Sequence, residues 1–93
     1  IAQSARFVSS AQDRLLAGIV ADNLMVEAMA GAAPLERGAR EAQADYAGLS
    51  WVARQTVTET GVDGLVRIDI AVRGAGSPQT LASVTTLKRE GRR

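Results

Sequence analysis

The N-terminal third of the chain has the hydrophobic pattern of one long helix. Apolar residues recur at steps of three and four along one face of this segment: Val8, Ala11, Leu15, Ile19, Val26 and Met29. Further apolar residues lie beside this stripe and widen it: Phe7, Leu16, Val20, Leu24 and Met25. Gly31 and Pro34 then end the pattern, because glycine often terminates helices and proline cannot continue them. We therefore expect a helix over residues 1–30 and a connector over residues 31–40.

The expected helix is longer than the rest of the domain can cover. At about 1.5 Å per residue it would be roughly 45 Å long, and the chain has 93 residues in total, enough for one domain of modest size. We expect Leu24, Met25 and Met29 to pack against the remainder of the domain, near the connector. Apolar residues nearer the N-terminus are expected to need a partner, which makes them the candidate interface: Phe7, Val8, Ala11, Leu15 and Ile19.

The rest of the chain alternates apolar and polar residues, the pattern of antiparallel strands that are covered on one face. The clearest strand has four apolar residues in alternation: Val66, Ile68, Ile70 and Val72. A strand before it places four residues on one face: Leu49, Trp51, Ala53 and Val57. Residues 41–49 predict an edge strand and residues 60–64 a turn. Residues 80–87 predict a last strand, and residues 88–93 a solvent-exposed basic tail.

These elements together predict an α+β fold. A long N-terminal helix would pack by its C-terminal half on a small antiparallel sheet formed by residues 41–87. The whole chain, residues 1–93, is expected to form a single domain, because it is too short for a second core.

The composition excludes most enzymatic chemistry. The chain has no His and no Cys, which removes the commonest general base, the usual metal ligands and thiol chemistry. Its serines have no His to activate them, so we expect neither an enzyme nor a cofactor or metal site. The formal net charge is only +1, and Glu90 interrupts the basic tail. Both observations argue against nucleic acid as a partner.

Several short motifs resemble one protein family over nearly the whole chain. The first helix carries Ala21-Asp22-Asn23-Leu24, similar to that family's Ala-(Asp/Glu)-Asn triplet followed by an apolar residue. The family then has a Gly-rich, variable connector and a Trp that opens a strand, which are matched by Gly48 and Trp51. Three strand motifs follow, matched by Val57-Thr58, Leu65-Val66-Arg67-Ile68, and Thr80 to Leu87. In these features the sequence resembles the minor pseudopilins of the bacterial type II secretion system, in particular the I-type (general secretion pathway protein I).

The resemblance implies a pilin-like fold and a structural role in protein export. By that resemblance, a hydrophobic helix upstream of Ile1 would anchor the protein in the inner membrane, with this domain in the periplasm. The domain would join other minor pseudopilins, the J-type directly and the K-type in a ternary complex. Together these subunits would form the tip that starts pseudopilus assembly. The family's prepilin peptidase site and early Glu are not in this sequence, which begins within the helical pattern.

Two other functions fit the same pattern and predict different observations. A minor pilin of a type IV pilus or competence system would share the fold and differ in its partners. A small periplasmic ligand-binding module would have a pocket lined by Trp51 and Tyr46, and a helix no longer than its sheet.

Three residues have expected local roles. Trp51 is expected in the core, because a lone Trp at the start of a strand fills volume in a domain poor in aromatic residues. Asn23 and Asp22 have below-average helix propensity, since their side chains compete for backbone hydrogen bonds. We expect Asn23 to tie the helix to the connector, whereas Asp22 either joins that tie or points into solvent.

Overall fold

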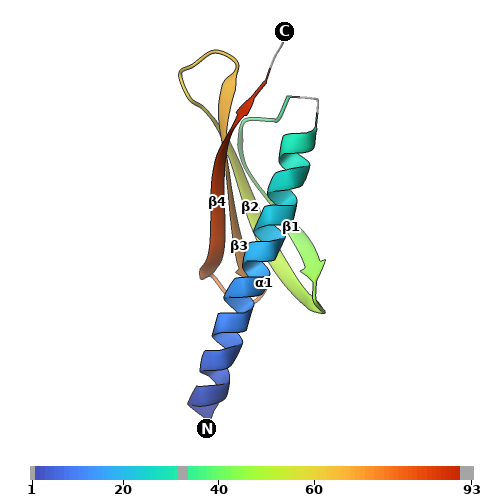
Figure 1. The fold of residues 1–93 in the computed structure, drawn as a ribbon, viewed down its shortest axis with the longest axis vertical. Coiled ribbons are helices and arrows are strands. Elements are labelled where there is room, and N and C mark those ends of the chain that lie inside the picture. The colour runs from blue at the N-terminus through green and yellow to red at the C-terminus, as the bar shows by residue number, and fades with distance from the viewer. Residues whose placement is uncertain (1, 32–33, 91–93) are drawn as a thin grey trace.

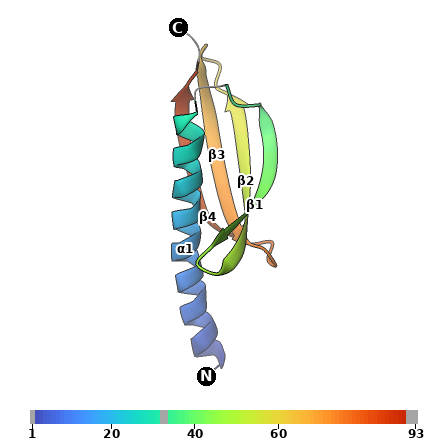
Figure 2. The same ribbon diagram turned by 90° about the vertical axis from the view of Figure 1, so that its right-hand side faces the viewer.

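The computed structural model describes residues 2–31 and 34–90, with side chains from Ala11 onward. Over these ranges the chain forms the helix α1 (Ala2–Ala30) and then four strands: β1 (Gly38–Tyr46), β2 (Leu49–Glu59), β3 (Leu65–Gly74) and β4 (Thr80–Arg89). The strands form one antiparallel sheet in the order β1-β2-β3-β4. The helix lies along one face of that sheet (Figures 1 and 2). This arrangement confirms the predicted α+β, pilin-like fold.

The core lies between α1 and the inner face of the sheet. The alternation in β3 buries Val66, Ile68, Ile70 and Val72, which are at most 1% exposed, as predicted. The inner face of β2 contributes Trp51, Ala53 and Val57, all buried, so the prediction that Trp51 belongs to the core is confirmed. Leu49 was expected beside them, but it is 45% exposed, because it lies at the end of its strand next to the hairpin turn.

The strands extend further than the sequence pattern predicted. The sheet begins at Gly38, within the expected connector, and β4 continues to Arg89, within the expected tail. Ala47 and Gly48 form the two-residue turn between β1 and β2, with φ angles of 56° and 77°. Positive φ at both turn residues gives a twist that matches the twist of the flanking strands.

The helix packs mainly on β3 and β4, and its N-terminal turns extend beyond the sheet (Figures 1 and 2). The molecule is accordingly elongated, with principal extents of 58 × 22 × 17 Å. The predicted packing through the C-terminal half of the helix is confirmed. Within the described part of the chain, no helix combines the length and hydropathy that a membrane crossing requires.

The end of β4 holds the C-terminal end of α1 and the connector through two charged side chains. Lys88 is 7% exposed, and its Nζ donates hydrogen bonds of 2.8 Å to the carbonyl oxygens of Ala28 and Gly31. A helix end leaves such carbonyls without intrahelical partners, and it attracts positive charge. Glu90 Oε2 accepts a hydrogen bond of 2.7 Å from the backbone N–H of Leu35. The two side chains thus link the last strand to the helix and to the connector.

Arg37 extends this linkage to β2. Its Nη1 lies 3.2 Å from Glu90 Oε1, and its Nε donates a 2.7 Å hydrogen bond to Glu59 Oε2. The hydrogen bond from the Leu35 N–H, assisted by Arg37 and Lys88, lowers the pKa of the Glu90 carboxyl below its ordinary value, although burial acts in the opposite direction. We call Lys88, Glu90 and Arg37 the clasp.

The clasp corrects two predictions. The stretch from Lys88 to Glu90 is not a solvent-exposed tail, because Lys88 is buried and Glu90 binds the connector; residues 91–93 lie outside the described residues. The expected tie through Asn23 is also wrong. Asn23 and Asp22 are both exposed, and neither makes a side-chain hydrogen bond or ion pair with another described residue. Asp22 therefore follows its second alternative and points into solvent.

Replacing Lys88 with Met should lower the free energy of unfolding by about 1–3 kcal/mol. Met keeps an apolar stem but leaves the carbonyl oxygens of Ala28 and Gly31 without their charged donor. In a domain of this size, each kcal/mol corresponds to a fall in Tm of roughly 4–8 °C, which thermal denaturation followed by circular dichroism would measure. Arg89→Met is the control, because Arg89 is the exposed next residue. Equal effects of the two variants would contradict the role of the buried ammonium group.

Candidate partner-binding surface

The face of α1 turned away from the sheet carries a row of apolar side chains. This outer stripe consists of Ala11, Leu15, Ile19, Val26 and Met29. Leu15 is 68% exposed, Val26 66% and Met29 41%, whereas Ile19 is half-buried. From its first residue to its last, the stripe covers roughly 27 Å of helix. Exposed apolar side chains in such a row are typical of a protein-interaction site, and the exposed Asp22 interrupts the row between Ile19 and Val26.

The opposite face of α1, which packs on the sheet, is built mostly from small residues. Its buried residues are Ala17, Val20, Ala21 and Ala28, and its partly buried ones are Leu16, Leu24 and Met25. Alanine side chains let the helix backbone approach the branched residues of β3 closely. The predicted contact of Leu24 and Met25 with the core is therefore confirmed, whereas the predicted burial of Met29 is wrong.

One residue explains why the larger apolar side chains face outward. Asp22 lies seven residues after Leu15 and four before Val26, so all three share one side of the helix. If this side were turned to the sheet, the Asp22 carboxylate would be buried among aliphatic side chains without a partner, at a large cost in free energy. The face between Ala17 and Ala28 has no charged residue at its buried positions. The helix therefore packs through its alanines.

The stripe differs in extent from the interface predicted from the sequence. Among the predicted residues, Ala11 and Leu15 are exposed and Ile19 is half-buried. Phe7 and Val8 lie in α1, but their side chains are outside the described residues. These five positions remain a prediction, and the fold brings the first three into one row.

Sequence reasoning missed the C-terminal part of this row. Val26 and Met29 were assigned to the same face of the helix, but only residues nearer the N-terminus were expected to need a partner. Together with Asp22, Met25 and Ala30 they line a shallow hollow of about 470 Å³ on the outer side of α1. The predicted division of the helix along its length is therefore incomplete, and the role of its N-terminal half in partner binding stays a prediction. Over the described side chains the helix also divides by face.

The far face of the sheet is polar by comparison. Asp69 binds both Arg67 and the hydroxyl of Thr85, and the Thr85 hydrogen bond, followed by that of Arg67, lowers the pKa of the Asp69 carboxyl. Glu41 lies 3.7 Å from Arg54 on the neighbouring strand. Charged pairs such as these are well solvated, so the helix rather than this sheet face offers the apolar surface for a partner.

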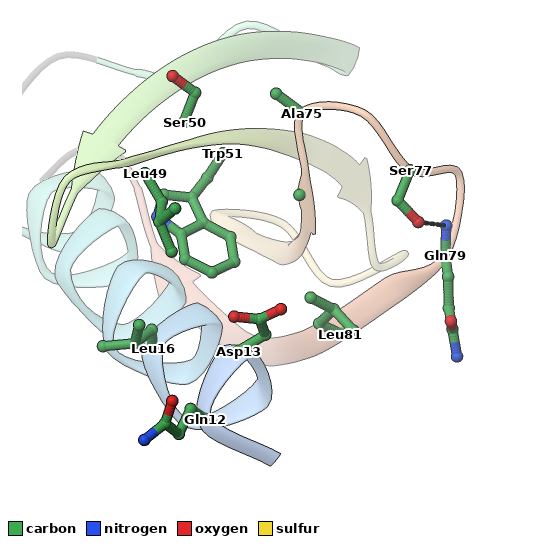
Figure 3. Close-up of a pocket in the computed structure, with 11 residues that line it drawn as sticks. Gln12, Asp13, Leu16, Leu49, Ser50, Trp51, Ala75, Ser77, Gln79 and Leu81 are labelled. Carbon is green, nitrogen blue, oxygen red and sulfur yellow. Dashed lines mark hydrogen bonds between the residues drawn. The ribbon is translucent and has the colours of Figure 1, made fainter. Parts of the chain in front are cut away.

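The observations disagree with a ligand-binding module. A hollow of about 590 Å³, to which Trp51 contributes, lies where α1 leaves the sheet (Figure 3), but Tyr46 is not among its described lining residues. Trp51 is 1% exposed, and its Nε1 donates a 3.1 Å hydrogen bond to the carbonyl oxygen of Tyr46. The helix is also longer than the sheet, contrary to the expectation for such a module.

The comparison with protein families decides between the two pilin-like alternatives. Residues 12–89 match the family model described as type II secretion system (T2SS), protein I. The chain belongs to this family. Its members are structural pseudopilins that serve protein transport by type II secretion and are associated with the cell envelope. No curated protein matches the chain. Membership confirms the resemblance seen in the sequence and favours type II secretion over a type IV pilus.

Proposed function

We propose that this domain is the part of an I-type minor pseudopilin that starts or caps the pseudopilus tip. It would bind the J-type pseudopilin directly and, through it, the K-type. The observation that carries this proposal is the outer stripe, because a helix already packed on its own sheet still presents Leu15, Val26 and Met29 to solvent. The domain would lie in the periplasm, with its anchor in the inner membrane.

The proposed mechanism is side-by-side packing of helices. The apolar residues of the outer stripe on either side of Asp22 can pack against those of a parallel helix, in the way that helices associate in coiled coils. Burial of aliphatic surface contributes roughly 25 cal/mol per Å², and this contribution does not depend on salt. The elongated shape of the domain leaves the N-terminal turns of α1 free of the sheet, so a partner helix has access to them (Figure 2).

We expect the purified domain to form a heterodimer with the periplasmic domain of a J-type pseudopilin. Because the main contribution is apolar burial, binding should persist at high ionic strength and weaken by no more than about tenfold. Gel filtration and isothermal titration calorimetry at low and high salt would measure both properties. The far sheet face offers a matched control, since Arg67→Gln should leave the affinity unchanged. Absence of a complex, or a complex lost entirely at high salt, would contradict the proposed packing.

A further inference from the structure

All the sulfur of this chain lies in one part of the outer surface. The chain has two methionines and no cysteine, and Met25 and Met29 lie about one turn apart on α1. Both line the shallow hollow of about 470 Å³ on the outer side of the helix, together with Asp22, Val26 and Ala30. Because thioethers are open to oxidation, sulfur oxidation in this protein takes place beside the outer stripe.

The two methionines have different surroundings. Met29 is 41% exposed and belongs to the outer stripe. Met25 is half-buried and packs against the hydrophobic core. An oxidant in solution therefore contacts Met29 more readily than Met25, and the two residues provide an internal comparison on a single helix.

Oxidation would convert Met29 from an apolar side chain into a polar one. The sulfur lone pair attacks the terminal oxygen of a hydroperoxide, and the S–O bond forms as the O–O bond breaks. The proton of the transferred oxygen passes to the leaving oxygen, which departs as water or an alcohol. Sulfur is thereby oxidised by two electrons and the peroxide is reduced. The sulfoxide oxygen accepts hydrogen bonds, whereas a thioether is at most a weak acceptor.

We propose that Met29 is a site of oxidation by hydroperoxides, and that its sulfoxide weakens the packing of a partner helix on the outer stripe. In the free domain, water hydrates the sulfoxide oxygen, so the fold keeps its stability. In the complex, the same oxygen would be buried beside Val26 among aliphatic side chains, without a hydrogen-bond donor. This inference rests on the proposed function and deepens it, because it states how the same surface is regulated.

The test combines mass spectrometry with calorimetry. The purified domain is treated with hydrogen peroxide, the peroxide is removed with catalase, and peptide mapping follows the sulfoxide at each methionine over time. Met29 should be oxidised several times faster than Met25. In calorimetric titration, the domain oxidised at Met29 should bind the J-type periplasmic domain about tenfold more weakly than the untreated domain. Its Tm, measured by circular dichroism, should be unchanged.

Two variants form a matched pair for this experiment. Leucine replaces methionine at similar volume and has no sulfur to oxidise. Met29→Leu should bind the J-type domain with the same affinity before and after peroxide treatment. Met25→Leu keeps Met29, so peroxide should lower its affinity as it does for the wild type.

The outcomes separate this inference from the proposed function. If the oxidised wild type binds as tightly as the untreated protein, the regulation through Met29 is wrong and the helix packing stands. Equal oxidation rates at Met25 and Met29, a lower Tm after oxidation of Met29, or a loss of affinity in peroxide-treated Met29→Leu would also overturn the inference. If the untreated wild type does not bind the J-type domain at all, the proposed function and this inference both fail.

Discussion

Replacing Leu15 with Asp should abolish binding to the J-type domain and leave the isolated domain folded. Leu15 is 68% exposed on the outer side of α1, so its loss removes no core contact. Exposed substitutions of this kind change the free energy of unfolding by less than about 1 kcal/mol. In the complex, the same Asp would place a charge without a partner inside an apolar interface, which opposes binding strongly.

A matched pair of substitutions tests whether the two faces of α1 have different roles. Val26→Asp should behave like Leu15→Asp, because Val26 is 66% exposed on the same stripe. Ala21→Asp introduces the same side chain only five residues away, but Ala21 is fully buried against the sheet, so this variant should not fold. Thermal denaturation and gel filtration with the J-type domain measure the two effects separately. A folded Ala21→Asp variant, or an unfolded Val26→Asp variant, would mean that the assignment of faces is wrong.

Replacing Trp51 with Ala should lower the free energy of unfolding by about 3–5 kcal/mol. In the sheet register, Trp51 lies opposite Ala44 on β1 and Gly74 on β3, so its ring fills space that its small neighbours leave open. Neither neighbour can extend into the cavity that the substitution creates. Since small domains are stable by only about 5–15 kcal/mol, the Trp51→Ala protein should lose a large share of its stability.

Trp51→Ala removes the only tryptophan of the chain, so its unfolding cannot be followed by tryptophan fluorescence. Urea denaturation followed by circular dichroism would measure the loss of stability instead. Trp51→Phe keeps an aromatic ring and loses the hydrogen bond to the Tyr46 carbonyl, so it should cost less than Trp51→Ala. Leu87→Ala is the surface control, since Leu87 is 53% exposed on the outer side of β4. A Trp51→Ala variant as stable as Leu87→Ala would show that the ring is not part of the core.

The sheet could be predicted well from the sequence, because the period of two is a local signal. The alternation from Val66 to Val72 identified β3 and its buried face, and the turn at residues 60–64 separated it from β2. The start of β1 was placed too late, since its residues are almost all exposed and so carry no hydrophobic pattern. An edge strand is held mainly by backbone pairing with its neighbour, which residue types do not reveal.

The orientation of the helix was harder to predict than its existence. Leu15, Val26 and Met29 carry more hydrophobic area than Ala17, Ala21 and Ala28, so hydrophobicity did not reveal that the alanines pack on the sheet and that Met29 is exposed. The signal that could have corrected this is Asp22, which occupies the more hydrophobic face.

The clasp could not be predicted from local patterns. Lys88 binds carbonyl groups that are 60 and 57 residues away in the sequence, and Glu90 binds a backbone group 55 residues away. A basic residue near the end of a chain is usually solvated, so its burial follows only from the place where β4 ends beside the helix. Contacts of this range depend on the completed fold.

The clasp also determines how the domain responds to mechanical load. Lys88 and Glu90 hold one end of the helix–sheet unit, whereas the other end of α1 extends past the sheet (Figure 1). A pull along the helix axis would slide α1 parallel to the strands, so the clasp and the buried alanine face would resist together. A sideways force on the extended end would peel the helix away turn by turn. We therefore expect the domain to be stiffer along its long axis than across it.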